Sequence, residues 1–80
     1  MGSTGRDMGL EKPVKKSLVI AGHATSIALE PVFWAILKNM AERQACSLPE
    51  LIAAIDAEPR PASLSSALRQ RAALFLQNHR

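Results

Sequence analysis

The fold is decided by residues 23–34, which read HATSIALEPVFW. Residues 23–29 alternate between two sides of an extended strand, because side chains in a strand have a period of two. Glu30-Pro31 then changes the period, since proline fits the first turn of a helix, where its missing N–H is not needed. The strand presents Thr25, Ile27 and Leu29 on one side and Ala24, Ser26 and Ala28 on the other.

This strand needs a partner, because unpaired backbone N–H and C=O groups are unfavourable when they are buried. No second convincing strand follows it. Before it, Leu18-Val19-Ile20 is β-prone, but Gly22 interrupts the pattern, and a glycine there indicates a bulge or a close backbone approach. We therefore expect the regular ribbon over residues 23–29, with Leu18–Ile20 as an extension or an arm packed elsewhere. The simplest partner is the same strand of a second chain, which predicts an intertwined homodimer.

Three helices are predicted after the strand, so the fold class is mainly α. The first covers about residues 31–44, where Phe33, Ile36, Leu37 and Met40 recur at helical spacing. The second begins at Ser47, because Glu50 three residues later completes a capping box. It ends near residue 57, and the third runs from residue 63 or 65 to about residue 78. The break between them is Glu58-Pro59-Arg60-Pro61, which cannot continue a helix.

The length of 80 residues allows one domain. Residues 1–13 are expected to form a flexible leader, because they are rich in glycine and mixed charges, and residues 14–80 are expected to form the domain. A chain of this size folds alone only marginally, and 48% of its residues are hydrophobic. These features also favour a dimer, in which a partner hides apolar surface.

The charge is mildly basic, with a formal net charge of +3. This permits nucleic-acid binding without establishing it. Lys15 and Lys16 precede the strand, and we interpret them as contacts to the DNA backbone on either side of the ribbon, the alternative being a solvated arm. Arg69 and Arg71 are interpreted as solvated positions of the third helix.

Other classes of function find little support in the sequence. Cys46 is the only cysteine, so neither an internal disulfide nor a cysteine metal cluster is expected. His23 has no nearby ligand partner, and no pairing of a nucleophile with a base is visible. No apolar run has the length of a membrane span. We therefore expect a cytoplasmic protein that is not an enzyme and that has no catalytic residues, metal or cofactor.

Several short runs of the sequence stand out by their order and spacing. They are Ile20-Ala21-Gly22-His23, Thr25-Ser26-Ile27, Leu29-Glu30-Pro31, Phe33-Trp34, Ser47-Leu48, Ile55-Asp56 and Leu64-Ser65-Ser66-Ala67-Leu68-Arg69. Taken together, these runs resemble the ribbon-helix-helix DNA-binding proteins, the Arc- and MetJ-like class. The resemblance is closest to bacterial predicted DNA-binding proteins with such a domain, and it covers about residues 17–80.

The resemblance implies a transcriptional regulator that binds double-stranded DNA as an intertwined homodimer. Its two-stranded ribbon would enter the major groove, with Ala24, Ser26 and Ala28 outward, and the start of the second helix at Ser47 and Leu48 would hold a backbone phosphate. Two of the outward positions are alanine, and only Ser26 has a side chain that forms hydrogen bonds. The implied dimer core is Thr25, Ile27, Leu29, Phe33, Trp34 and Leu37.

A second hypothesis is a protein-interaction module. In this interpretation the dimer is a scaffold, and Leu18–Ile20 or the third helix docks a protein partner, as an antitoxin docks a toxin. The alanines on the ribbon favour it, because they offer little for base readout.

Overall fold

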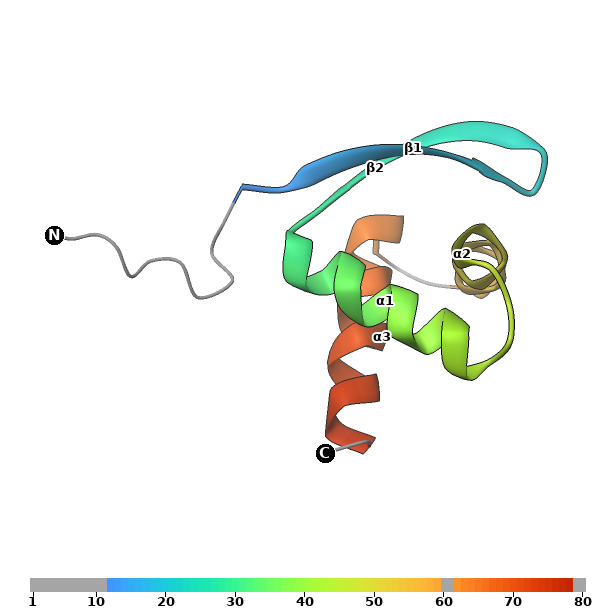
Figure 1. Ribbon diagram of the computed structural model, residues 1–80. Coiled ribbons are helices and arrows are strands. Elements are labelled where there is room, and N and C mark those ends of the chain that lie inside the picture. The colour runs from blue at the N-terminus through green and yellow to red at the C-terminus, as the bar shows by residue number, and fades with distance from the viewer. Residues whose placement is uncertain (1–11, 60–61, 79–80) are drawn as a thin grey trace, which may run out of the picture.

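The computed structural model describes residues 12–59 and 62–78. Two strands precede three helices, and the strands form an antiparallel hairpin that lies along one side of the helical part (Figure 1). Residues 1–11 of the predicted leader lie outside the described part of the chain. The elements are β1 (Val14–Ile20), β2 (His23–Leu29), α1 (Pro31–Arg43), α2 (Leu48–Asp56) and α3 (Leu64–Asn78).

The hairpin turn consists of Ala21 and Gly22, which both have positive φ, at 52° and 84°. Positive φ at both central residues defines a type I′ turn, whose twist matches that of the two strands it joins. Ile20 and His23 flank the turn as the first cross-strand pair, and the register continues to Val14 opposite Leu29. The turn therefore fixes the pairing of all seven residues in each strand.

The prediction that β2 has no partner within its own chain is wrong, because β1 pairs with it along its whole length. Leu18–Ile20 is accordingly part of a strand and not a separate arm. Gly22 forms the turn and not a bulge. The pairing of β2 across a dimer, which was inferred from this missing partner, stays a prediction.

The helices begin and end close to the predicted residues, for local reasons. Glu30 is the N-cap of α1 and Pro31 occupies its first turn. At the other end Ala45 has φ 57°, the Cys46 N–H donates to the Ala41 carbonyl at 3.0 Å, and the Ala45 N–H donates to the Glu42 carbonyl at 3.1 Å. These two bonds form a Schellman motif, which ends the helix and turns the chain toward α2.

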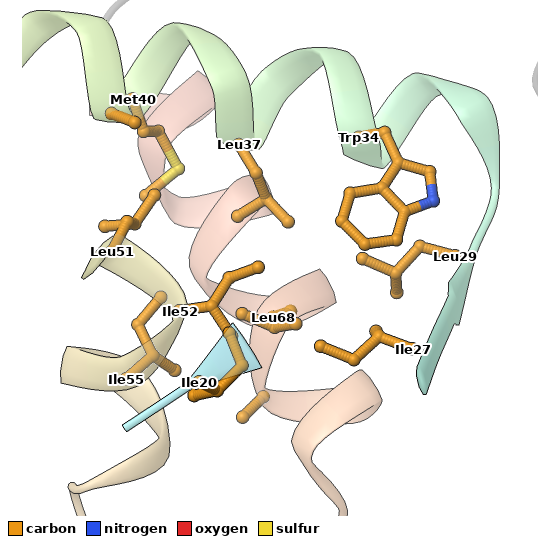
Figure 2. Close-up of a cluster of buried hydrophobic side chains, with 12 residues drawn as sticks. Ile20, Ile27, Leu29, Trp34, Leu37, Met40, Leu51, Ile52, Ile55 and Leu68 are labelled. Atoms are coloured by element: carbon orange, nitrogen blue, oxygen red, sulfur yellow. The ribbon is translucent and has the colours of Figure 1, made fainter. Parts of the chain in front are cut away.

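The core lies between the hairpin and all three helices (Figure 2). Ile27, Leu29, Trp34 and Leu37, four of the predicted dimer-core residues, are buried within one chain, while Thr25 and Phe33 are half-buried. A role for these residues in a core shared by two chains stays a prediction. The buried residues of the described part are all apolar: Ile20, Ile27, Leu29, Trp34, Leu37, Met40, Ala41, Leu51, Ile52, Ile55, Ala67, Leu68 and Ala72.

The type I′ turn provides a test of the hairpin. Ala21→Asn is expected to raise the free energy of unfolding by about 0.5–1 kcal/mol, because asparagine adopts positive φ more readily than alanine. Gly22→Ala is the opposite control, and it should lower the free energy of unfolding by about 1 kcal/mol. Urea denaturation measures both. A destabilised Ala21→Asn protein would contradict the turn.

Candidate nucleic-acid interface

One face of the hairpin points away from the helices, and we call it the outward face. Residues directly opposite in the register share a face, so this face consists of three cross-strand rows. Every residue of this face is exposed except Ala28, which is half-buried. Ala24, Ser26 and Ala28 lie here, as the alternation of β2 predicted. Sequence reasoning missed the contribution of Ser17 and Val19, because β1 was not recognised. The rows are Lys15 with Ala28, Ser17 with Ser26, and Val19 with Ala24.

The middle row holds two facing hydroxyl groups. The Oγ atoms of Ser17 and Ser26 lie 3.4 Å apart and either one can be the donor. Both side chains are exposed, so both can also exchange hydrogen bonds with a ligand on the outward face. Serine donates and accepts equally well, and therefore discriminates poorly between bases.

The two lysines of β1 point to opposite faces of the hairpin. Lys15 belongs to the outward face, opposite Ala28. Lys16 lies on the other face, where its Nζ is 5.4 Å from the centre of the Trp34 ring, within the range of a cation–π interaction. Trp34 also donates from Nε1 to the Val14 carbonyl at 2.9 Å, which anchors β1 to α1. Lys15 and Lys16, which were predicted to contact DNA together, therefore lie on different faces. Lys15 is on the outward face, and Lys16 packs on α1.

The hairpin is electropositive. Residues 12–29 contain Lys12, Lys15 and Lys16 but neither aspartate nor glutamate. The first carboxylate after the hairpin is Glu30, and it is neutralised by Arg69, whose Nε and a terminal guanidinium nitrogen donate to its two oxygens at 2.9 and 3.2 Å. The positive potential of the outward face is thus not offset by a free carboxylate in the hairpin.

Arg69 and Arg71 were interpreted as solvated; their side chains are 35% and 38% exposed, and each also forms an ion pair that the sequence did not predict. Arg69 lies 5.9 Å from the ring centre of Phe33 in addition to binding Glu30, so it fixes the end of β2 and the start of α1 to α3. Arg71 donates to Glu58 at 2.7 Å, which ties α3 to the end of α2. Both arginines stabilise the packing of α3, and neither belongs to the outward face.

The ion pair of Glu30 and Arg69 should make stability depend on pH. Hydrogen bonding from Arg69 holds the pKa of Glu30 below its ordinary value of 4.5. A carboxyl group whose pKa is lowered by folding stabilises the folded state above its ordinary pKa, and this contribution is lost as the pH falls through the folded-state pKa. Urea denaturation should therefore show Glu30→Gln to be less stable than the wild type at neutral pH, with a difference that shrinks below pH 4.5.

Glu42→Gln is the control for that experiment, because it removes one negative charge from an exposed position on α1. It should change stability at neutral pH less than Glu30→Gln does. A difference between Glu30→Gln and the wild type that stayed constant down to strongly acidic pH would contradict the ion pair.

The start of α2 is the other predicted contact to DNA. The Glu50 N–H donates to the Ser47 Oγ at 3.1 Å, and the Ser47 N–H donates to the Glu50 carboxylate at 2.8 Å, which confirms the capping box. These bonds also lower the pKa of Glu50. Pro49 has no N–H, so a phosphate would meet mainly the Leu48 N–H, beside an ionised carboxylate. Contacts of Ser47 and Leu48 with phosphate stay a prediction. The capping box by itself accounts for the residues found at the start of α2.

The described residues contain no group of three or more histidine, cysteine, aspartate or glutamate side chains placed to hold a metal ion. Cys46 is a half-buried free thiol after α1. Among the helices described, none combines the length and the apolar character needed to cross a membrane.

Comparison with known proteins supplies the family. The family model described as "Ribbon-helix-helix domain" matches residues 13–75, which is most of the chain. The chain therefore belongs to the ribbon-helix-helix domain family. No curated protein and no solved structure matches the chain. The family supports a DNA-binding regulatory role, and the hairpin and the helices that follow it agree with that class.

Proposed function

We propose that the protein is a homodimeric transcriptional regulator that places the outward face of its hairpin on the major groove of double-stranded DNA. The observation that carries the proposal is the composition of this face: largely exposed, made mainly of small side chains, carrying Lys15 and free of carboxylates. Such a face can approach a phosphate-lined groove closely without repulsion. Membership of the ribbon-helix-helix family supports the same proposal.

The dimer forms along the free edge of β2. In a two-residue hairpin the pair next to the turn is hydrogen-bonded and the pairs then alternate, so the backbone N–H and C=O groups of Ala24, Ser26 and Ala28 point away from β1. This edge carries neither lysine nor proline. The free edge of β1 carries lysines and follows Pro13, features that protect a strand edge from pairing. The unprotected edge of β2 is therefore the one that pairs with β2 of a second chain.

Antiparallel pairing about Ser26 gives a four-stranded sheet with both copies of β2 at its centre. Adjacent strands lie about 4.8 Å apart, so the four strands span about 14 Å between the outer ones. The major groove is about 12 Å wide, so the two central strands lie over its floor and each β1 lies near a groove rim. Lys15 is then placed beside the phosphates, where a lysine contributes affinity independent of sequence. Small residues lie at the centre, where space is least.

Proline substitutions test which edge pairs. Ser26 and Ser17 face each other in a pair whose backbone N–H groups point outward, so proline at either position spares the bonds within the hairpin. Ser26→Pro is expected to give a folded monomer by sedimentation equilibrium, because it removes a central donor of the dimer. Ser17→Pro is the matched control and should remain dimeric. A dimeric Ser26→Pro protein, or a monomeric wild type, would contradict the proposed dimer.

DNA binding is tested by fluorescence anisotropy with two labelled duplexes, one from the region upstream of the protein's own gene and one scrambled, each at two salt concentrations. A preference for the upstream duplex that persists at the higher salt is expected of a regulator of its own expression. Weak and equal binding that disappears with salt would mean contacts driven by charge alone, and it would count against sequence-specific regulation.

A protein-interaction module remains the second candidate, and one observation favours it. Leu74 and Leu76 on α3 are 51% and 48% exposed, so two large apolar side chains of this helix are open to solvent. In Leu18–Ile20, the other predicted docking segment, Ile20 is buried in the core and Leu18 packs against it, which leaves only Val19 exposed. A stoichiometric protein partner that survives nuclease treatment and is released by Leu74→Ser with Leu76→Ser would support this candidate.

A further inference from the structure

We infer that the outward face reads DNA through the C5-methyl groups of thymine. This inference rests on the proposed function and deepens it, because it names the chemical feature of DNA that the hairpin recognises. It follows from what the outward face contains and from the way the register groups its apolar side chains.

The outward face has few groups for hydrogen-bonded readout. Guanine and adenine are usually read by arginine, lysine, asparagine or glutamine, and of these the outward face holds only Lys15, in the outer strand. Its central residues offer one hydroxyl per chain, that of Ser26. Ser17 adds a second hydroxyl in the outer strand, and the other side chains, Val19, Ala24 and Ala28, are apolar. The thymine methyl is the apolar group that the major groove presents on its base edges, so it is the complement of these side chains.

The apolar side chains form a patch. Val19 is 64% exposed, the highest value among the large hydrophobic residues described, and it stands directly opposite Ala24. Their pair is of the type that is not hydrogen-bonded, in which side chains approach most closely. In the proposed dimer the row continues across the centre, from Ala24 to Ala28 of the partner subunit. Each half of the sheet thus carries an apolar row that no polar side chain interrupts until the partner subunit's Lys15.

The two apolar rows lie symmetrically about the row of serines. Along β2, Ala24 lies two residues before Ser26 and Ala28 lies two residues after it. At about 3.4 Å per residue, the two rows are therefore about 14 Å apart. That distance is roughly four base-pair steps of about 3.4 Å each. The preferred site is therefore one with thymines placed symmetrically about its centre, and with tolerance at the centre itself, where serine discriminates little.

The charge around the patch favours DNA over a protein as its occupant. The patch borders Lys15, and residues 12–29 carry no carboxylate. An apolar patch made of alanines and one valine per chain is also shallow, and it offers no pocket for a large side chain of the kind that anchors protein interfaces. It suits a methyl group held on a flat, anionic surface.

The test compares duplexes that differ only in this methyl group, with binding measured by fluorescence anisotropy. One duplex alternates dA and dT, and its partner carries deoxyuridine in place of every thymidine. A second pair alternates dG with dC or with 5-methylcytosine, which adds the same methyl to a different base pair. The wild type should bind the thymine duplex roughly 15-fold more tightly than the uracil duplex, because two methyl contacts of about fourfold each are lost. The methylated cytosine duplex should likewise bind more tightly than the unmethylated one.

The matched variant is Ala24→Ser with Ala28→Ser, which keeps the charge and the fold but makes the centre polar. Its thymine-to-uracil ratio should fall to about one, whereas Val32→Thr, an exposed change on α1, should leave the ratio unchanged. Equal affinity of the wild type for both duplexes would overturn the inference and leave the proposed function standing. A preference that persisted in the serine variant would also overturn it. Failure to bind any duplex, including the upstream one, would instead overturn the proposed function.

Discussion

Ile27→Asp is expected to unfold the protein. Ile27 is 3% exposed in the core between β2 and the helices, and the variant would bury a carboxylate there without a partner. Such a change has a destabilising effect of at least about 4 kcal/mol. A domain of this size rarely has more than about 3–5 kcal/mol of stability, so little folded protein should remain. Circular dichroism and thermal denaturation measure the effect.

The control is Ala24→Asp, which places the same charge on the other face of the same strand. Ala24 is exposed, so this variant should keep its helical spectrum. A folded Ile27→Asp protein with a cooperative transition would show that the inward face of β2 is not the core. Unfolding of both variants would show that the hairpin tolerates no charge on either face, against the assignment of an outward face.

The second large effect is expected on DNA binding, for Lys15→Glu. Lys15 is the charged residue of the outward face, and in the dimer the change alters two symmetric contacts with phosphate. Affinity for every duplex should fall by more than about tenfold at moderate salt, with little change in sequence preference. The milder Lys15→Ala should reduce the steepness of the salt dependence by about one contact per chain.

Lys38→Glu is the matched control, because it makes the same change in net charge at an exposed position on α1. It should weaken binding much less than Lys15→Glu does. Equal losses for the two variants would mean that net charge, rather than the outward face, governs binding. Lys16→Ala separates the two lysines further: it should lower stability through Trp34 more than it lowers DNA affinity.

The helices and the faces of β2 could be predicted from the sequence because their causes are local. Ser47 and Glu50 lie three residues apart, and the capping box that they form is present in the structure. The alternation over residues 23–29 correctly placed Ile27 and Leu29 inward. Both signals depend on residues close together in the chain, where spacing alone decides which side chains meet.

β1 was missed because its signals conflict. Lys16 lies on the inward side between Val14 and Leu18, where it packs its stem and charge on Trp34, so the strand does not alternate cleanly. The turn is Ala-Gly instead of the Asn-Gly that usually marks a two-residue hairpin. The pair of Glu30 with Arg69 joins residues 39 positions apart, and neither spacing nor composition reveals such a contact. The contacts of Lys16 with Trp34 and of Arg69 with Glu30 join residues far apart in the chain, so they depend on the tertiary fold.

The core that a single chain closes around its own hairpin has a consequence for how the protein would respond to its own abundance. A chain that is folded before it meets a partner can exchange partners without unfolding, since only the edge of β2 has to separate. Operator occupancy would then rise with the square of protein concentration at low abundance, because two preformed chains must associate before DNA is engaged. Such a regulator would respond steeply to its own concentration.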